Sequence, residues 1–331
     1  MAPRPADPDE RMTLRASWQI GAVIVAVCLL LFVRCVAIAE TTPAADELAD
    51  APPSAKDCIV VAGRRFQIGA RVVTWTEPGG YSAYREGKHF DRSAGLDGER
   101  RYGTRSDNPR SLAALREGVH QFVVHYDACG TSRQCFKVLH DVRDLSVHFM
   151  LDVDGTIYQT LDLKERAWHA TIANDHAVGV EIAHPGAWLS PLNADMRRWY
   201  SKDAAGWRMK YPAWLEETGV RTEGFVPRPD RPDFVSGVVQ GREYHQFDFT
   251  SEQYDALAKL IAGLNRALPR IALAAPRDRS GAVIDHVLPA DELLRFDGVV
   301  GHFHVQANKQ DPGPAFQWDR VLDDARRLRA R

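Results

Sequence analysis

Apolar residues along this chain follow two spacings. Short apolar runs, typical of buried strands, lie at 122–124 and 299–301, and each is followed directly by a histidine, His125 or His302. Between 178 and 183, valine and isoleucine alternate with glycine, glutamate and alanine, which predicts a strand with one apolar face. Glu181 then points away from that face.

Helical spacing occurs in three further segments. A threonine or serine at 131–132 is a suitable cap for a helix that continues to about residue 142. A threonine or serine at 250–251 is placed in the same way before a helix that continues to about residue 268. Another helical turn is expected at 290–296.

Strands and helices therefore alternate along the chain. Asp154-Gly155 separates β-prone runs at 147–153 and 156–160, which predicts a hairpin with a type I′ turn. Two more short strands are expected at 59–62 and 71–75. This order predicts an α/β domain with a central mixed β-sheet flanked by helices.

The first 57 residues carry an export pattern. Residues 19–33 are apolar or small after the first position, although a spanning helix needs about 20 such residues. Ala37-Ile38-Ala39 fits a signal-peptidase cleavage pattern. Residues 1–39 are thus either a cleaved signal peptide or an uncleaved membrane anchor; both export the rest, because the preceding arginines favour a cytoplasmic N-terminus. Residues 40–57 are expected to form a flexible linker.

Composition removes one class of partner. The chain has 331 residues, 45% of them hydrophobic and 26% charged, and its net charge of −2 gives no reason to expect nucleic acid as a partner.

Cys129 and Cys135 lie close together in the sequence. In an oxidising compartment such a pair is expected to form a disulfide rather than a metal site.

The stretch Gly301–Pro314 combines imidazole, ammonium and carboxylate groups within a segment rich in turn formers. Zinc binds His nitrogen and Asp oxygen, and a catalytic zinc has three protein ligands and one open position. His302 and Asp311 supply two ligands, and His125, also at a strand end, supplies the third. His304 is an alternative ligand, because strand alternation keeps it on the same side as His302.

These residues resemble a known family. The matching pieces are His125, Gly301-His302, the Lys-x-Asp-Pro-Gly-Pro run 309–314, Ala-Trp-His-Ala at 167–170 and Gly-Val-Glu-Ile at 179–182. Together they resemble the zinc-dependent N-acetylmuramoyl-L-alanine amidases, a family that includes phage amidase lysozymes and peptidoglycan recognition proteins. The Cys129–Cys135 spacing also resembles the recognition proteins. The resemblance implies the same α/β fold and a peptidoglycan or muropeptide substrate.

The chemistry that follows is amide hydrolysis. Zinc acidifies water and polarises the carbonyl, Glu181 is expected to act as general base, and Lys309 to stabilise the developing negative charge. The resemblance assigns the same roles to the matching glutamate and lysine, and places His169 in the substrate groove. His148, the second expected substrate contact, stands where phage-type enzymes carry tyrosine, which leaves Glu181 as the proton acceptor.

The amidase domain is expected at 58–331, with an N-terminal elaboration at 58–118 and an aromatic-rich insertion at 186–249. The aromatic residues of the insertion form either a small core of its own, which we favour, or a surface that stacks on sugar rings. Two other functions stay open: a peptidoglycan-binding module without catalysis, and a zinc peptidase that acts on the stem peptide. Export favours wall material as the substrate.

Overall fold

The computed structural model describes residues 56–91, 93, 95, 100–106 and 111–330. By its internal contacts the chain divides into two units, 1–48 and 49–331, and every described residue belongs to the second. The predicted signal or anchor, 1–39, and almost all of the predicted linker, 40–57, lie outside the described residues. Among the described residues, no helix combines the length and the apolar character that crossing a membrane requires.

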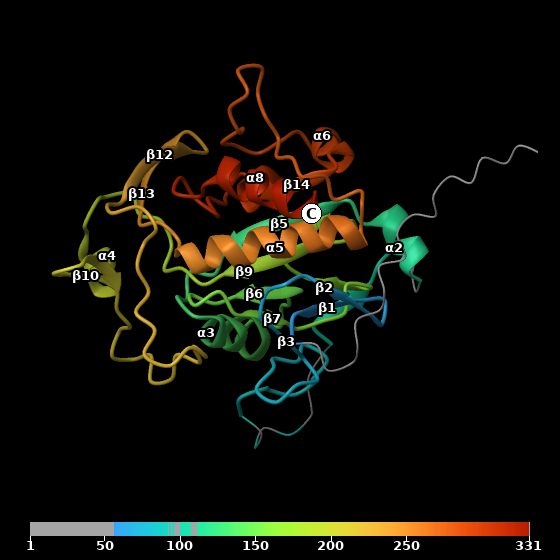
Figure 1. Cartoon of the computed structure of the whole chain (residues 1–331), viewed down its shortest axis with the longest axis horizontal. Helices are drawn as coiled ribbons and strands as arrows, with labels where there is room; N and C mark the ends of the chain where they lie inside the picture. Colours follow the sequence, from blue (N-terminus) through green and yellow to red (C-terminus); the bar gives the residue numbers. More distant parts are fainter. Residues whose placement is uncertain (1–55, 92, 94, 96–99, 107–110, 331) are drawn as a thin grey trace, which may run out of the picture. The chain divides into compact units, whose positions relative to one another are not determined.

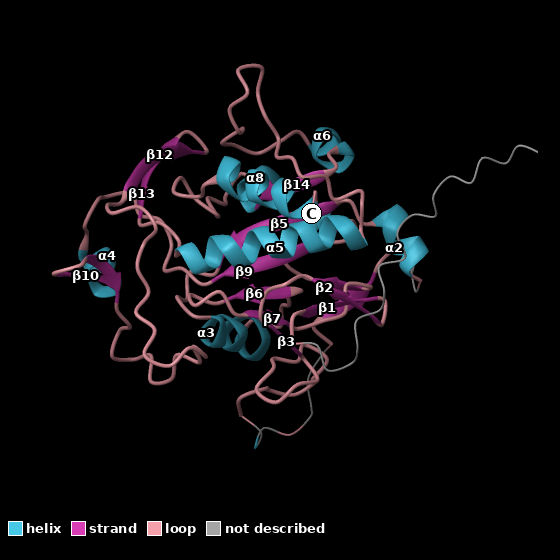
Figure 2. Ribbon diagram, in the orientation of Figure 1, coloured by secondary structure: helices cyan, strands magenta, loops and turns pink. Residues whose placement is uncertain are grey.

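A six-stranded mixed sheet forms the centre of the second unit (Figure 2), as the sequence predicts. All neighbouring strands in it run parallel except β6 and β7, which are antiparallel. In spatial order the strands are β14 (Gly298–Gly301), β5 (Gln121–Tyr126), β9 (Ala177–Ile182), β6 (Phe149–Leu151), β7 (Ile157–Gln159) and β3 (Val72–Thr74).

The predicted helices are present. The helix α5 (Ser251–Ala267) runs across one face of the sheet (Figure 1), and Thr250 and Gln253 form a capping box at its start. Thr131 caps α3 (Ser132–Phe136), which continues as a π-helix, Lys137–Val142. The other helices in the described part of the chain are α2 (Leu112–Gly118), the 3₁₀ helix Thr171–Ala173, α4 (Ala194–Trp199), α6 (Ala290–Arg295), α7 (His302–Val305) and α8 (Trp318–Arg329).

The predicted hairpin forms, but its turn differs from the prediction. A type I′ turn needs positive φ at both central residues. Gly155 has a φ of 78°, whereas Asp154 is not among the residues with positive φ. The amide of Gly155 donates to the carbonyl of Asp152 at 3.0 Å, so the turn begins at Asp152, one residue earlier than expected.

Among the described residues, four two-stranded sheets accompany the central one. The sequence predicted only the first strand among them. They pair β1 (Cys58–Val61) with β2 (Arg64–Gln67), β4 (Tyr102–Thr104) with β8 (Glu165–Ala167), β10 (Tyr200–Asp203) with β11 (Gly206–Met209), and β12 (Val235–Val239) with β13 (Arg242–Gln246).

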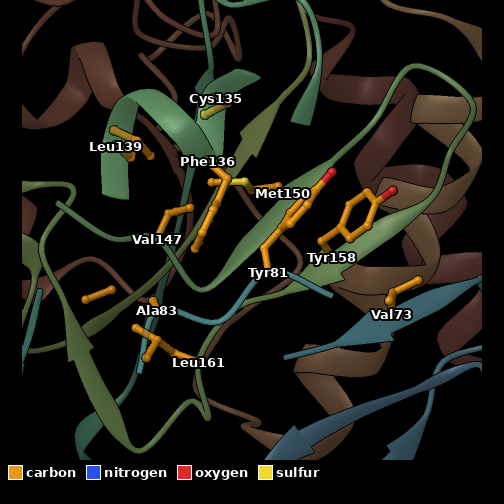
Figure 3. Close-up of a cluster of buried hydrophobic side chains, with 11 residues drawn as sticks. Val73, Tyr81, Ala83, Cys135, Phe136, Leu139, Val147, Met150, Tyr158 and Leu161 are labelled. Atoms are coloured by element: carbon orange, nitrogen blue, oxygen red, sulfur yellow. The ribbon is translucent and has the colours of Figure 1, made fainter. Parts of the chain in front are cut away.

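The N-terminal elaboration is part of the hydrophobic core. Tyr81 is 5% exposed and stacks between Phe136 and Tyr158, with ring centroids 5.2 and 4.4 Å away (Figure 3). The burial of these three aromatic rings stabilises the attachment of the elaboration to α3 and β7.

The aromatic residues of the insertion lie in a buried cluster, which also includes Val153 and Ala183 of the main domain. Trp199, Met209 and Phe247 are buried in one cluster, with Trp188 and Trp207 packed against it. Burial of their apolar surface explains the aromatic content of this segment.

Candidate metal centre

Three side chains converge at one end of the sheet. The Nδ1 atoms of His125 and His302 lie 2.9 Å apart, and Asp311 Oδ2 lies 3.1 Å from the first and 2.9 Å from the second. The exposed fractions of the three residues are 1%, 6% and 8%. In the described part of the chain this is the only group of three such ligands found with its atoms within 4.8 Å of one another.

Strand register explains the convergence. Gly301, the last residue of β14, pairs with Val124 of β5 in parallel, so that His302 and His125 follow at the same level. Asp311 comes from the loop after α7, and its carbonyl accepts the amide of Phe303 at 3.1 Å. The loop therefore folds back over the strand ends and completes the set.

The chemistry of the three ligand atoms fits a divalent cation. His302 Nε2 can donate to Gln306 Oε1 at 2.9 Å, and His125 Nε2 can donate to His169 Nδ1 at 3.0 Å. With these protons on Nε2, both Nδ1 atoms carry lone pairs, the tautomer that a metal ligand needs. Burial lowers the pKa of His125 to about 4, so it is neutral at neutral pH.

The third ligand atom is anionic. Burial alone would raise the pKa of Asp311, but the neighbouring His302 and His125 hold it well below its usual value. The Nδ1 lone pairs of His125 and His302 thus face the carboxylate of Asp311. Zinc bonds of 2.0–2.1 Å place tetrahedral ligand atoms roughly 3.3 Å apart, so a bound ion needs shifts of only a few tenths of an ångström.

Glu181 lies beside this centre, on the face of β9 that the sequence predicted. It pairs in register with His125. Glu181 lines a cavity of about 280 Å³ whose wall also includes His302, Lys309 and Asp311. Glu181 Oε2 has no hydrogen-bond partner among the described residues. Burial, followed by the nearby Asp311, raises the pKa of Glu181 well above its ordinary value.

His169 lines the same cavity and contacts a metal ligand directly. Its ring lies over Gly179 of β9, where an added Cβ would come within 2.5 Å of it. Glycine at this position therefore leaves the space that the imidazole ring occupies. His169 takes part in the arrangement through His125 Nε2.

His148 differs from its predicted position in the substrate groove. It is fully buried, its Nδ1 accepts the amide of Gly179 at 3.2 Å, and its Nε2 donates to the carbonyl of Glu165 at 3.0 Å. Burial lowers its pKa to about 3. Because both ring nitrogens are bonded to backbone groups inside the protein, His148 supports the sheet and does not face a substrate.

His304, the alternative ligand, points away from the centre. The amide of Gly301 donates to His304 Nδ1 at 2.9 Å, and His304 Nε2 donates to the carbonyl of Ile284 at 2.6 Å. His304 lies in the helical turn α7, which begins at His302, and so does not continue the strand. The alternation that would place it beside His302 therefore does not apply.

The predicted disulfide is absent, since Cys129 and Cys135 are both free cysteines in the structure. Cys135 lies in the hydrophobic cluster of Figure 3, where a neutral thiol packs as a small apolar side chain. Burial, followed by the neighbouring Cys129 thiol, raises the pKa of Cys135 well above its ordinary value.

Sequence reasoning missed Asp127, two residues after His125. Its Oδ1 accepts three backbone amides, those of Cys129, Gly130 and His184, at 2.8, 2.9 and 3.0 Å. These bonds join the loop after β5 to the end of β9. An aspartate followed by a glycine-containing turn is the available signal in the sequence.

Arg105, from the N-terminal elaboration, was also missed. Arg105 is 3% exposed. Its guanidinium group donates to the carbonyl of Leu163 at 3.0 and 3.3 Å. It also donates to the carbonyls of Asn174 and Ala177, both at 3.0 Å. Asn174 Oδ1 in turn accepts the amide of His169 at 3.2 Å. The elaboration therefore supports the loop that carries His169.

Comparison with known proteins gives a family. The family model described as N-acetylmuramoyl-L-alanine amidase matches residues 115–314. A search of curated proteins gives no match.

Several solved structures are similar in part. AmpD is 18% identical, with 69% of this chain and 89% of that chain covered and a TM-score of 0.33. The E. coli amidase AmiD, solved with the substrate anhydro-N-acetylmuramic acid-L-Ala-D-gamma-Glu-L-Lys, is 17% identical over 68% of this chain and 66% of its own, with a TM-score of 0.36. The Ph2119 endolysin from a Thermus scotoductus bacteriophage is 14% identical, with coverage of 77% and 99% and a TM-score of 0.34.

The family model covers more than half of the chain and contains all three converging ligands, His125, His302 and Asp311. It also contains Glu181 and Lys309. This protein belongs to the N-acetylmuramoyl-L-alanine amidase family.

Proposed function

We propose that this protein is a zinc-dependent amidase that hydrolyses the bond between N-acetylmuramic acid and L-alanine in peptidoglycan. The observation that carries the proposal is the convergence of His125, His302 and Asp311 beside the buried carboxyl group of Glu181. Bound zinc would supply Lewis acidity and a water whose pKa is near 7.

Glu181 is proposed as the general base. Glu181 lines a cavity with two of the ligands, His302 and Asp311, and is the register partner of the third, His125. Its raised pKa makes the carboxylate a stronger proton acceptor than an exposed glutamate. The protonated carboxyl group can then return the proton to the leaving amine of L-alanine.

Lys309 is proposed to stabilise the oxyanion that develops on the carbonyl. It lines the same cavity, two residues before Asp311. A cation held in a partly dry site stabilises developing negative charge more strongly than it does in water.

The reaction is tested by mass spectrometry of muropeptides after digestion with the zinc-loaded protein. Release of intact stem peptides that begin with L-alanine supports the proposal. Products cut inside the stem peptide would favour a peptidase. Binding to sacculi without any product would favour a recognition module.

Export to the cell envelope is a separate proposal that rests on the apolar run 19–33 and its arginines. Fractionation of cells that express the full-length protein tests it. Recovery in the cytosolic fraction, with residues 1–39 intact, would contradict export.

A further inference from the structure

The insertion supplies a hairpin that contacts the metal loop directly. The strands β12 and β13 form this hairpin, and the metal loop is the segment 306–315 that carries Lys309 and Asp311. Two glutamines of the hairpin, Gln240 at its turn and Gln246 at its end, bond to backbone groups of the metal loop or of the helical turn before it.

Gln246 holds the end of the metal loop that follows Asp311. Its side chain is 0% exposed, Nε2 donates to the carbonyl of Pro312 at 3.0 Å, and Oε1 accepts the amide of Ala315 at 2.9 Å. Gly313 lies between these two contacts with a φ of 86°, and an added Cβ would lie 2.2 Å from Gln246 Oε1. The amide group of Gln246 therefore fills the concave side of the turn.

Gln240 holds the other end. Its Nε2 donates to the carbonyls of Phe303, Gln306 and Lys309 at 2.8, 3.1 and 3.3 Å. Its Oε1 accepts the amide of Val287 at 3.2 Å. The side chain of Gln240 thus connects the helical turn α7 to the backbone of Lys309.

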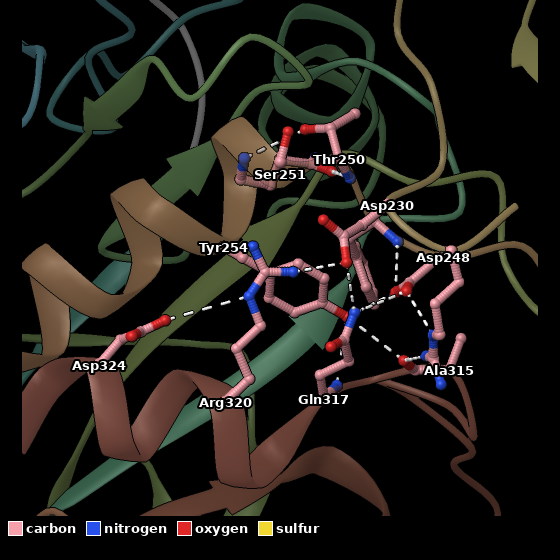
Figure 4. Close-up of polar contacts among 12 residues, drawn as sticks. Asp230, Asp248, Thr250, Ser251, Tyr254, Ala315, Gln317, Arg320 and Asp324 are labelled. Atoms are coloured by element: carbon pink, nitrogen blue, oxygen red, sulfur yellow. Dashed lines mark hydrogen bonds and ion pairs between the residues drawn. The ribbon is translucent and has the colours of Figure 1, made fainter. Parts of the chain in front are cut away.

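A polar network continues the attachment beyond the metal loop. Arg231 of the insertion donates to the carbonyl of Ala315 and, at 2.6 Å, to Asp248 Oδ2. Gln317 Nε2 donates to the same Asp248 oxygen at 2.7 Å, and the hydroxyl of Tyr254 donates to Asp248 Oδ1 at 2.6 Å (Figure 4). The network ties the chain after the metal loop to α5.

We propose that Gln246 and Gln240 are positioning residues, which set Asp311 and Lys309 against the histidines and the glutamate that the sheet carries. This inference rests on the proposed function. Sheet-borne groups are fixed by strand register, whereas the metal loop has no regular structure to fix it. Ligands held in place by bonded neighbours bind metal more tightly than ligands that must be ordered on binding.

The first test is the zinc affinity of the full-length protein, measured by competition with a chromophoric chelator. Gln246→Met keeps the side-chain volume and removes both hydrogen bonds. The matched control is Gln159→Met, because Gln159 is also 0% exposed and bonds to Val60 and Leu161 from β7, three strands away from β5. We expect Gln246→Met to weaken zinc binding by about 10–100-fold, and Gln159→Met to leave it unchanged.

Substitution with Co²⁺ gives a second readout, since its visible absorption reports the ligand set. Loss of Asp311 from the ligand set of Gln246→Met would change this spectrum, and an unchanged spectrum with parental affinity would overturn the inference. An equal loss of affinity in Gln159→Met would assign the effect to general destabilisation and overturn it as well. If the parent protein itself binds no zinc, the result contradicts the proposed function rather than the positioning role of the glutamines.

Gln240→Met covers the case in which Gln246→Met does not fold, because Gln240 is half-buried at a hairpin turn. Gln240 bonds to the backbone of Lys309 rather than to that of a ligand. We expect parental zinc affinity and an unchanged KM, with kcat lowered about tenfold or more as an oxyanion-stabilising group is misplaced. Parental kcat in this variant would overturn the role of Gln240.

Discussion

Glu181 and His125 are register partners on the neighbouring parallel strands β9 and β5. Partners in register point to the same face of a sheet, so the side chain of the proposed base and the first metal ligand are fixed relative to each other by backbone hydrogen bonds. Glu181 therefore lines the cavity beside the metal ligands, and no loop lies between it and His125.

The ligand assignment predicts the zinc content of variants. Loss of a residue that hydrogen-bonds to a metal ligand typically lowers metal affinity about 10–100-fold. His302→Ala and Asp311→Ala each remove a ligand itself and should lower zinc affinity by more than this. Chelator competition followed by metal analysis gives the measurement.

His304→Gln is the control for this prediction. His304 is as buried as the ligands, but its nitrogens bond to Gly301 and Ile284. The variant should melt at a lower temperature and keep its zinc. Loss of zinc in His304→Gln with retention in His302→Ala would reverse the assignment.

A second prediction separates the proposed catalytic groups from the ligands. Glu181→Gln and Lys309→Ala should each keep zinc and lower kcat about a hundredfold or more. Steady-state cleavage of a purified muropeptide, measured on zinc-loaded protein, checks both.

Glu181→Gln keeps the size of the side chain, so a lower kcat in this variant is not explained by a change in folding. Near-normal cleavage by Glu181→Gln would mean that another group accepts the proton. His169 would then be the next candidate, because it lines the same cavity.

A third prediction concerns stability against pH and rests on Asp152. Its side chain is 0% exposed, and burial raises its pKa to about 8. Between about pH 4 and pH 8 the unfolded chain has released this proton while the folded protein holds it, so the free energy of unfolding falls as pH rises. The total is at most a few kcal/mol.

Asp152→Asn removes this dependence, so the variant should gain stability relative to the parent at pH 8 and not at pH 4. Urea unfolding at the two pH values measures the difference. Asp154→Asn is the matched control, because the pKa of Asp154 is shifted in the opposite direction to that of Asp152. Hydrogen bonds from Thr156 and Thr222 outweigh burial and lower the pKa of Asp154. A parent-like slope in Asp152→Asn would contradict the prediction.

The last prediction tests the turn after Asp311. Gly313→Ala adds a Cβ at a φ of 86° and within 2.2 Å of Gln246 Oε1, so both backbone strain and displacement of Gln246 are expected. The variant should lose zinc affinity as well as stability. Thermal unfolding with chelator competition measures the two effects.

Gly63→Ala isolates the backbone contribution, because Gly63 has a φ of 78° with nothing within 4 Å of an added Cβ. It should cost only the roughly 1–2 kcal/mol of a left-handed non-glycine residue. Equal effects of the two substitutions, with zinc affinity unchanged in both, would show that the contact with Gln246 is unimportant.

The sequence by itself determined the elements and the side chains that reach the site. Strand ends at His125 and His302, the face of Glu181, the cap at Thr250 and the Asp311 ligand all followed from short-range patterns. These features are encoded within a few residues, because side chains alternate along a strand and a cap bonds only three residues ahead.

Tertiary structure decided which histidines face the centre and what holds the metal loop. His148 and His169 each follow an apolar residue, Val147 or Trp168, yet one supports the sheet from inside and the other contacts His125. The bonds from Gln246 to Pro312 and from Gln240 to Lys309 join segments more than 60 residues apart. No local pattern specifies such contacts, because they exist only once packing has brought the insertion against the strand ends.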